Sequence, residues 1–448
     1  MKALLLSISL VGGAGGATYR LHQGLQRLGI VSNVLVKTKF DNDEAVIAVP
    51  KTQFAKWLDR TVYLRAEKVS RLPFKLSPKR YGVRGFYLQW LPVYDLNAKV
   101  KQLDPDVINL HWICNDFLSI ETIPKFNKPL VWTLHDMWAF TGGCDYSLDC
   151  DRYMNSCGAC PQLDSNKDRD LSHWVWQRKV KAWKNLKSTV VTPSSWLAKR
   201  VSSSSLFKDL RVEVIPNGLD TETFKPINRQ VAREILNLPQ DKQIVLFGAW
   251  HNEYRKGFHL LEPALRSLSK SEWSNKIEVV IFGFSEPINR SDLGFKTHYL
   301  GKLNDAKSLA LAYGAADVFV APSLYDNLPT TVMEAIACGT PCVAFNIGGV
   351  PDLIDHQQNG YIARPYEIDD LAKGIAWILA DRDRHQQLSA RARAKAEREF
   401  TLELQARRYR DLFEEVSETH RRDFYTTEKV LITRGCSFNT KIPIKSDE

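Results

Sequence analysis

Short apolar runs alternate along the chain with stretches in which apolar residues recur at helical spacing. The runs predict strands at residues 3–11, 31–36, 107–111, 130–134, 189–192, 212–215, 244–247, 279–282, 318–321 and 341–344. The periodic stretches predict helices near residues 175–187, 195–203, 258–270, 305–314, 331–338, 368–380, 384–398 and 401–418. Alternating strands and helices are typical of parallel, doubly wound sheets, so the pattern predicts an α/β fold.

The N-terminal segment has two interpretations. Its basic start, short apolar run and small residues are typical of a signal peptide. The same run also fits a buried strand followed by a glycine loop at 12–16, a helix carrying Leu21, Leu25 and Leu28, and a second strand at 31–36. We favour the second interpretation because the later residues complete that unit. We therefore expect a cytoplasmic protein that keeps this segment.

The length of 448 residues exceeds the usual size of a single core and predicts two domains. The best boundary is Ile215-Pro216-Asn217-Gly218, where a strand ends in turn residues. We expect a first domain at 1–218, a second at 219–396, and a C-terminal part at 397–448. The helical stretch of that last part is expected to pack back on the first domain, and its tail stays unassigned.

The net charge of +10 is concentrated between residues 56 and 84, and apolar and aromatic side chains interleave with the basic ones up to residue 90. Basic and aromatic residues together suit an anionic membrane surface or a polyanion. Alternatively, and with equal weight, the stretch forms an ordinary pair of helices whose basic face is only solvated and binds no partner. No nucleic-acid-binding motif accompanies the charge, so no nucleic acid partner is expected. No apolar run approaches the ~20 residues that span a bilayer. We thus expect the protein to contact a membrane only at the inner face of that membrane, through residues 56–90.

The stretch from residue 322 to 351 carries the strongest chemical signal. Asp326 and Glu334 lie eight residues apart around a predicted helix start. Thr331-x-x-Glu334 has capping-box spacing, Gly339 lies where a C-cap is expected, and Pro341 blocks continuation. A helix N-terminus favours phosphate, and carboxylates accept hydrogen bonds from sugar hydroxyls. This combination indicates a nucleotide sugar, whereas the plain alternative is that Glu334 only caps its helix and Asp326 only shapes a turn.

The candidate residues share one place in the predicted fold. Residues 12–16, His135, the loop after residue 247, and Asp326 all follow predicted strands. In doubly wound folds ligands bind at the carboxyl ends of the strands. This convergence is stronger evidence for a site than any single motif.

With these residues the chain resembles the retaining glycosyltransferases of family four, over roughly residues 1–418. The matching parts are the glycine-rich first segment, His135-Asp136, Thr192-Pro193-Ser194, Ile215-Pro216-Asn217-Gly218, Lys256-Gly257, Pro322-Ser323, the two acids of 326 and 334, and Gly348-Gly349. The resemblance implies the GT-B architecture, two Rossmann-like domains facing a central cleft. It also implies transfer of a sugar from a nucleotide-diphosphate sugar to a glycan or lipid-linked acceptor, with retention at the anomeric carbon and no catalytic cofactor.

In the second domain, the resemblance implies that Glu334 binds ribose hydroxyls and Asp326 binds the donor sugar. The amides around Thr330 and Thr331 are implied to hold the diphosphate. The family usually has Glu where this chain has Asp326, which is one methylene shorter.

Cationic and first-domain residues complete the implied site. His135 is implied to contact the donor sugar, and Gly15 and Gly16 to let the first loop approach the phosphates. Lys256, together with Arg255, can stabilise the leaving diphosphate, although a solvated loop lysine is the commoner role of a Lys-Gly pair. The family usually places an Arg about six residues before the lysine, where this chain has Trp250. Arg255 or a residue outside the loop can supply that charge.

Two other functions compete with glycosyl transfer. A dinucleotide-dependent oxidoreductase is disfavoured because residues 12–16 lack the G-x-G-x-x-G spacing and no acid ends the strand at 31–36. A catalytically impaired nucleotide-sugar-binding protein is kept open by Trp250 and Asp326. Asp149-Cys150-Asp151 has the D-x-D pattern of metal–diphosphate sites, but such triplets arise readily by chance.

An insert at 142–161 contains Cys144, Cys150, Cys157 and Cys160, spaced C-x5-C-x6-C-x2-C. Four thiols in a cytosolic chain favour structural zinc over disulfides, with disulfides, a redox loop or unbound thiols as alternatives. The family core does not require this insert, which follows His135 closely and is placed to shape the acceptor side.

The zinc hypothesis predicts about one zinc ion per chain in reduced protein purified without chelators, because four thiolates complete a tetrahedral site. Elemental analysis measures this content directly. A zinc content near zero per chain would contradict the hypothesis.

Overall fold

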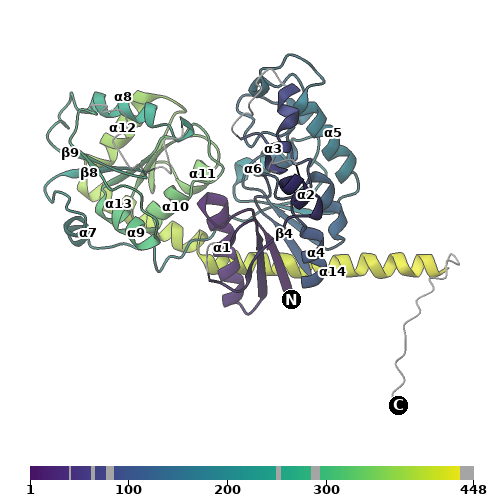
Figure 1. The fold of residues 1–448 in the computed structure, drawn as a ribbon. Helices are drawn as coiled ribbons and strands as arrows, with labels where there is room; N and C mark the ends of the chain where they lie inside the picture. The colour runs from purple at the N-terminus through teal and green to yellow at the C-terminus, as the bar shows by residue number, and fades with distance from the viewer. Residues whose placement is uncertain (40–41, 62–65, 77–84, 249–253, 284–292, 434–448) are drawn as a thin grey trace.

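The computed structural model describes residues 1–39, 42–61, 66–76, 85–248, 254–283 and 293–433. The chain forms two lobes, each built on one parallel sheet (Figure 1). The first sheet has the strand order β3-β2-β1-β4-β5-β6-β7. Its strands are β1 (Lys2–Leu6), β2 (Val31–Val36), β3 (Val46–Ala48), β4 (Val107–Leu110), β5 (Leu130–Thr133), β6 (Thr189–Thr192) and β7 (Val212–Val214).

The second sheet has the order β10-β9-β8-β11-β12-β13. Its strands are β8 (Gln243–Gly248), β9 (Ile277–Phe282), β10 (Thr297–Tyr299), β11 (Val318–Ala321), β12 (Cys342–Phe345) and β13 (Gly360–Ala363). The central strands of both sheets are buried runs of apolar residues, as expected where helices cover both faces. The predicted pair of doubly wound Rossmann-like domains is therefore confirmed.

Helices connect these strands. In the first lobe they are α1 (Gly12–Arg27), α2 (Gln53–Thr61), α3 (Ala66–Val69), α4 (Leu96–Leu103), α5 (Leu171–Trp183) and α6 (Ser195–Ser202), with short 3₁₀ turns at Leu72–Leu76, Ile120–Phe126, Trp138–Phe140, Arg152–Met154 and Pro161–Leu163. In the second lobe they are α7 (Arg229–Ile235), α8 (Phe258–Leu268), α9 (Ala306–Ala315), α10 (Thr330–Ala337), α11 (Val350–Leu353), α12 (Ile368–Leu379) and α13 (Arg382–Glu399), with a 3₁₀ turn at Tyr254–Lys256.

Both sheets have a topological switch point. In the first sheet, β1 lies between β2 and β4, and in the second sheet β8 lies between β9 and β11. Strand order reverses at these points, so the loops after the two neighbouring strands diverge and leave room for a ligand. The segments after β1, β8 and β11 are those in which the sequence predicted a site.

The predicted glycine loop at residues 12–16 is wrong, because α1 already begins at Gly12. A Cβ atom on Gly15 would come within 2.4 Å of the Ser9 carbonyl oxygen. The glycine therefore lets the first turn of α1 pack directly on the preceding segment. Glycine runs predict loops by propensity, but here tertiary packing decides the conformation.

Short edge elements were also missed. The strands β3, β10 and β13 have three or four residues each, which is too short for a clear apolar run. The helices α4 and α7 carry few buried side chains, so their periodicity is weak.

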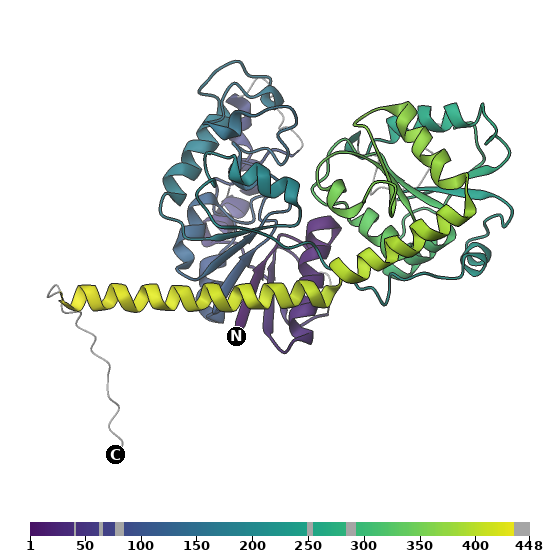
Figure 2. The ribbon, with the colours of Figure 1, turned by 180° about the vertical axis from the view of Figure 1, so that it is seen from behind.

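The last helix, α14 (Leu402–Thr433), extends well beyond the predicted end at residue 418. It crosses the first lobe and continues past it (Figure 2). The Tyr409 hydroxyl is 2.8 Å from the Thr133 hydroxyl, and a Cβ on Gly24 of α1 would lie only 2.9 Å from Ala406. Phe413 is completely buried in the same cluster. The C-terminal helix thus packs on the domain formed by the other end of the chain.

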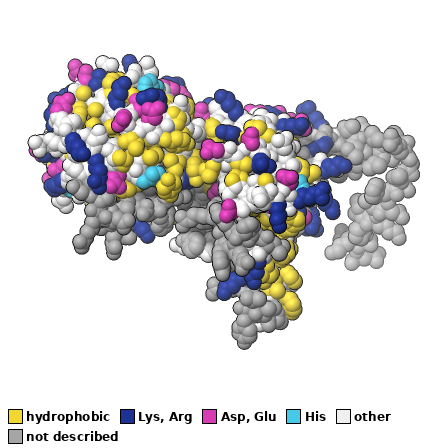
Figure 3. Space-filling model, turned by 90° about the horizontal axis from the view of Figure 1, so that it is seen from above, with side chains coloured by type: hydrophobic (Ala, Val, Ile, Leu, Met, Phe, Trp, Pro, Cys, Tyr) yellow, Lys and Arg dark blue, Asp and Glu magenta, His cyan; other side chains and the backbone are white. Residues whose placement is uncertain are grey.

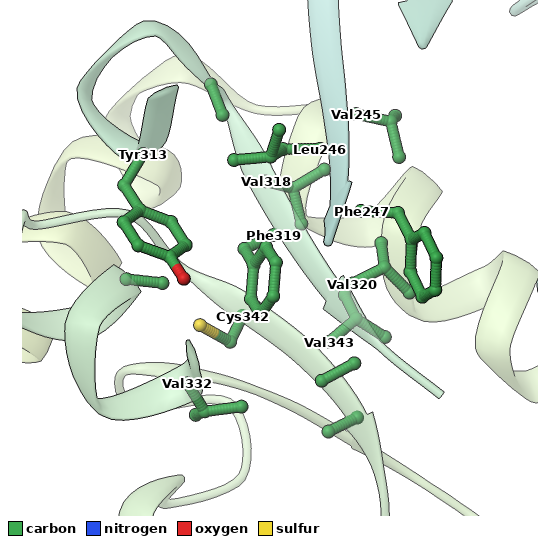
Figure 4. Packing of buried hydrophobic residues seen from close by; sticks show 14 of the residues in the cluster. Val245, Leu246, Phe247, Tyr313, Val318, Phe319, Val320, Val332, Cys342 and Val343 are labelled. Atoms are coloured by element: carbon green, nitrogen blue, oxygen red, sulfur yellow. The ribbon is translucent and has the colours of Figure 1, made fainter. Parts of the chain in front are cut away.

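The core of the second lobe positions a polar group. Tyr313 of α9 packs edge-on against Phe319 of β11, with ring centroids 5.3 Å apart (Figure 4). This packing directs the Tyr313 hydroxyl toward α10, where it donates to Glu334 Oε2 at 2.9 Å.

The described surface is mixed in charge. On the face shown in Figure 3, Lys and Arg side chains are spread over both lobes with Asp and Glu among them. Within the described residues, no helix combines the length and apolar character that crossing a bilayer requires.

Candidate active site

A cavity of about 380 Å³ lies where the two lobes meet at the carboxyl ends of their strands. Its first-domain wall contains residues 12–14, Trp112, His135, Asp136, Asp145, Tyr146 and Asn217. Its second-domain wall contains Gly248, Arg255, Lys256, residues 326–329, Thr330 and Thr331. Segments far apart in the sequence therefore share one cavity.

Two cations and one carboxylate dominate the second-domain wall. Lys256 Nζ is 2.7 Å from Asp326 Oδ2, and Arg255 is 3.2 Å from the same oxygen. Burial raises the pKa of Asp326, but the two cations outweigh burial and hold the pKa below its usual value. Asp326 is therefore ionised, and its negative charge partly neutralises Lys256 and Arg255. A bound diphosphate would neutralise the same two cations.

The helix α10 begins directly at this wall. Its N-cap is Pro329, which has no side chain that can accept a hydrogen bond from the first turn. The capping-box interpretation is wrong, because Thr331 lies inside the helix rather than at its cap. The first amides of α10, at Thr330 and Thr331, are thus left without a side-chain cap, which is the property of a helix N-terminus that suits phosphate oxygens. At the other end Gly339 has φ 73°, so its predicted role as C-terminal stop is confirmed.

Glu334 lies one turn further along α10. It is not among the described residues that line the cavity. Burial raises its pKa, opposed by the charge of Arg20 and by the hydroxyl of Tyr313. Its carboxylate is therefore held by the hydrogen bond from Tyr313. It also interacts electrostatically with Arg20 of the first domain.

His135 lines the cavity and pairs with a second histidine. His111 Nδ1 is 3.0 Å from His135 Nε2, and the rings stack with centroids 5.3 Å apart. Burial, together with the charge of Arg20, lowers the pKa of His135 to about 4. Both imidazoles are thus neutral near pH 7, and His135 can act as a neutral hydrogen-bonding partner.

Sequence reasoning missed two carboxyl groups. Asp136 and Asp145 both line the cavity. Burial raises the pKa of Asp136 to about 6, and burial and the neighbouring Asp136 raise the pKa of Asp145 to about 7. The position of Asp136 directly after His135 was an available signal, whereas nothing in the insert marked Asp145.

Asn327 joins the two domains. Its side-chain amide donates to the backbone oxygens of Leu134 and His135, at 3.4 and 3.1 Å, and the Ser194 hydroxyl donates to its Oδ1 at 2.6 Å. Its own N–H lies 3.2 Å from the Tyr146 hydroxyl. The residue beside Asp326 thus binds the loop that carries His135.

Gly15 and Gly16 do not line the cavity; residues 12–14 do. The α1 residue missed by sequence reasoning is Arg20, which donates from Nε to the Gly218 oxygen at 2.9 Å. Its charge acts on both His135 and Glu334. Trp250, the departure noted from the sequence, lies outside the described residues, as does part of the basic stretch at 56–90.

Two family models match consecutive parts of the chain. The one described as Glycosyltransferase Family 4 matches residues 11–223, and the one described as Glycosyl transferases group 1 matches residues 228–395. The chain belongs to the GT-B glycosyltransferases.

Relatives of this glycosyltransferase are distant. It is 24% identical over 363 residues to the colanic acid biosynthesis glycosyl transferase WcaC of Escherichia coli, covering 77% of this chain and 83% of the relative. It is 27% identical over 195 residues to an E. coli UDP-Gal:alpha-D-GlcNAc-diphosphoundecaprenol alpha-1,3-galactosyltransferase, covering 41% of this chain and only 49% of that protein.

Solved structures show the same fold. Sucrose-phosphate synthase of Thermosynechococcus elongatus has a TM-score of 0.67 at 21% identity, covering 93% of this chain and 99% of that one. Anabaena HepE in complex with UDP-glucose has a TM-score of 0.64 at 18% identity, covering 93% and 100%.

The cysteine insert of this glycosyltransferase has its four thiols around one small cavity, of about 20 Å³. Gly142 N–H donates to Cys157 Sγ at 3.1 Å, and burial raises the pKa of Cys144, Cys157 and Cys160. Among the residues described, no three Cys, His, Asp or Glu side chains are grouped so that they could hold a metal ion. Zinc stays a prediction.

The cation cluster predicts opposite effects of two substitutions on binding of inorganic pyrophosphate. Asp326→Asn removes the carboxylate that competes for Lys256 and Arg255, so pyrophosphate should bind several-fold more tightly. Lys256→Ala removes a cation and should weaken binding about tenfold or more. Calorimetry measures both affinities, with Lys302→Ala, an exposed lysine away from the cavity, as control. Equal affinities of wild type and Asp326→Asn would contradict this arrangement.

Proposed function

We propose that this glycosyltransferase moves a sugar from a nucleotide-diphosphate sugar to a glycan or lipid-linked acceptor with retention of anomeric configuration. The observation that carries the proposal is the cavity between the domains, where Arg255 and Lys256 face the N-terminus of α10. Such a wall suits a diphosphate, and the carboxylate of Asp326 suits sugar hydroxyls. Glu334, one turn behind this wall on α10, is proposed to bind the ribose hydroxyls.

The similar proteins support the substrate class. HepE was solved with UDP-glucose, and one E. coli relative is named as a galactosyltransferase that uses UDP-Gal and a lipid diphosphate acceptor. WcaC is named for colanic acid biosynthesis. These names support a nucleotide-sugar donor and a role in polysaccharide or glycolipid synthesis.

In the proposed step, the bond between the anomeric carbon and the diphosphate oxygen breaks while the acceptor hydroxyl oxygen attacks the same face of that carbon. The acceptor proton passes to the leaving diphosphate oxygen, and the nucleoside diphosphate departs. Lys256, Arg255 and the α10 amides stabilise the charge that develops on the leaving group. His135, neutral at pH 7, contacts the donor sugar.

Closure of the domains excludes water from this step. Asn327 holds the loop of His135 against the second domain, so the donor is enclosed by both walls. Enclosure favours transfer over hydrolysis of the activated sugar.

We expect His135→Ala and Glu334→Ala each to lower transfer at least tenfold without unfolding the protein, because the proposal assigns each side chain a contact with the donor, the sugar for His135 and the ribose for Glu334. Release of nucleoside diphosphate from UDP- and GDP-sugars measures turnover, and circular dichroism checks the fold. Near-wild-type turnover in both variants would remove these roles, and binding of donor with no turnover in the wild type would favour the impaired binding protein.

The proposal includes contact with an anionic membrane at its inner face. On α2, the rings of Phe54 and Trp57 are 49% and 53% exposed, and Lys56 and Arg60 are exposed beside them. An exposed aromatic pair with adjacent basic residues suits a headgroup layer.

Vesicles of anionic phospholipid should therefore co-sediment the protein at low ionic strength, and vesicles of neutral lipid should not. Phe54→Ser with Trp57→Ser should reduce the bound fraction several-fold, since the apolar anchor is lost. Equal binding of the double variant, or no binding of the wild type, would argue against this surface.

A further inference from the structure

A second cavity, of about 740 Å³, adjoins the first. It is lined by residues 145–152, Ala159, Pro161, Gln162 and Tyr325. Apart from Tyr325, which precedes Asp326, all of these residues belong to the cysteine insert or its borders. Asp145 and Tyr146 line both cavities, so they form the wall between them.

The shared wall is held in place by the backbone. Asp145 N–H donates to the Gly85 oxygen at 2.8 Å, and the Asp145 oxygen accepts from Met137 N–H at 2.7 Å. The Gln162 side chain donates to the Tyr146 oxygen at 2.6 Å. The fully buried Lys179 donates to the Trp138 and Thr141 oxygens, which fixes the start of the insert. The second cavity is therefore preformed rather than the surface of a loose loop.

The chemistry of this cavity fits an uncharged sugar. Asp145, Asp149 and Asp151 contribute three carboxyl groups against the single cation of Arg152. Carboxylates accept hydrogen bonds from hydroxyls, and an excess of negative charge disfavours phosphates and acidic sugars. Tyr146 and Tyr325, with ring centroids 5.0 Å apart, add apolar ring atoms to the lining. Trp196 and Arg255 also contact the Tyr146 ring and hold it in this position.

We propose that this second cavity binds the neutral, hydroxyl-rich sugar end of the acceptor, and that Asp145 accepts a hydrogen bond from an acceptor hydroxyl next to the one that attacks the donor. The proposal rests on the proposed function, since it assumes a donor sugar in the first cavity. It narrows the acceptor class: the sugar end near the reaction is uncharged, and any phosphate or lipid part lies outside this cavity.

The protonation of Asp145 agrees with that role. Burial and Asp136 raise its pKa to about 7, while Arg255 opposes the rise. Asp145 also interacts electrostatically with four other ionisable groups, namely Tyr87, Cys114, Cys144 and Tyr146. A carboxyl that is partly ionised near pH 7 can accept a hydroxyl hydrogen bond without the full cost of a buried charge.

A metal at Asp149 and Asp151 is the competing interpretation of the same carboxyls. The part of the chain that the structure describes contains no group of three or more donors arranged to hold a metal ion. The cavity is thus better explained by sugar hydroxyls than by a cation.

Saturation-transfer NMR with the methyl α-glycosides of glucose, galactose and mannose, and with the anionic methyl α-D-glucuronide, tests the proposal. At least one neutral glycoside should bind the wild type at least fivefold more tightly than the glucuronide. In the Asp149→Asn/Asp151→Asn variant the neutral glycoside should bind several-fold more weakly, and its preference over the glucuronide should fall toward one.

The matched control is Asp164→Asn, an exposed aspartate just beyond the insert that does not line the cavity, which should behave as wild type. Nucleotide binding is measured on the same samples. Binding of a nucleotide with no binding of any neutral glycoside, or an unchanged preference in the double variant, overturns the acceptor cavity alone. Absence of nucleotide binding instead counts against the donor site.

Discussion

The structure depends on positive charge held in a cleft that is closed from two sides. Arg255 and Lys256 come from the segment after β8, and without a ligand they are balanced by Asp326 from the segment after β11. Because both segments leave the second sheet at its switch point, the fold itself brings the three charges together. The N-terminus of α10 adds its amides to the same wall, so the wall combines two cations with backbone donors, which is the combination on which the proposed diphosphate site rests.

The first domain contributes the opposite wall, and few polar contacts hold it there. Asn327 is central to them, because its side chain bonds to Ser194 and to the loop of His135. Within the first domain, Arg20 bonds to Gly218 and α14 packs on β5 through Tyr409 and Thr133. The insert then extends the wall beyond the donor cavity, where Tyr146 lies between the two cavities. The proposed donor site, at the meeting of the two domains, is thus joined to the proposed acceptor site, which the cysteine insert forms.

The sequence was sufficient for the architecture, because buried parallel strands are continuous apolar runs and their order along the chain implies the switch points. It also singled out three residues that the structure places in the cavity lining, namely His135 after β5, Lys256 in the segment after β8 and Asp326 in the segment after β11. It failed where packing between distant segments decides the outcome. Gly12 to Gly16 have loop propensity, yet they form a helix because α1 packs on Ser9 and Leu10. Glu334 has the spacing of a cap, yet its partner is Tyr313, 21 residues away. Asn327 bonds to residues of the other domain, and Asp145 lines both cavities. A single sequence contains no periodic signal for such contacts.

The central claim is that two crevice walls enclose a nucleoside diphosphate carrying a sugar. Calorimetric titration of well-folded wild-type protein with UDP, GDP, ADP and TDP compounds tests it most directly. We expect saturable binding of at least one of these nucleotides, with an affinity that falls as salt screens the cations. No detectable heat of association with any of them at millimolar concentrations would contradict it.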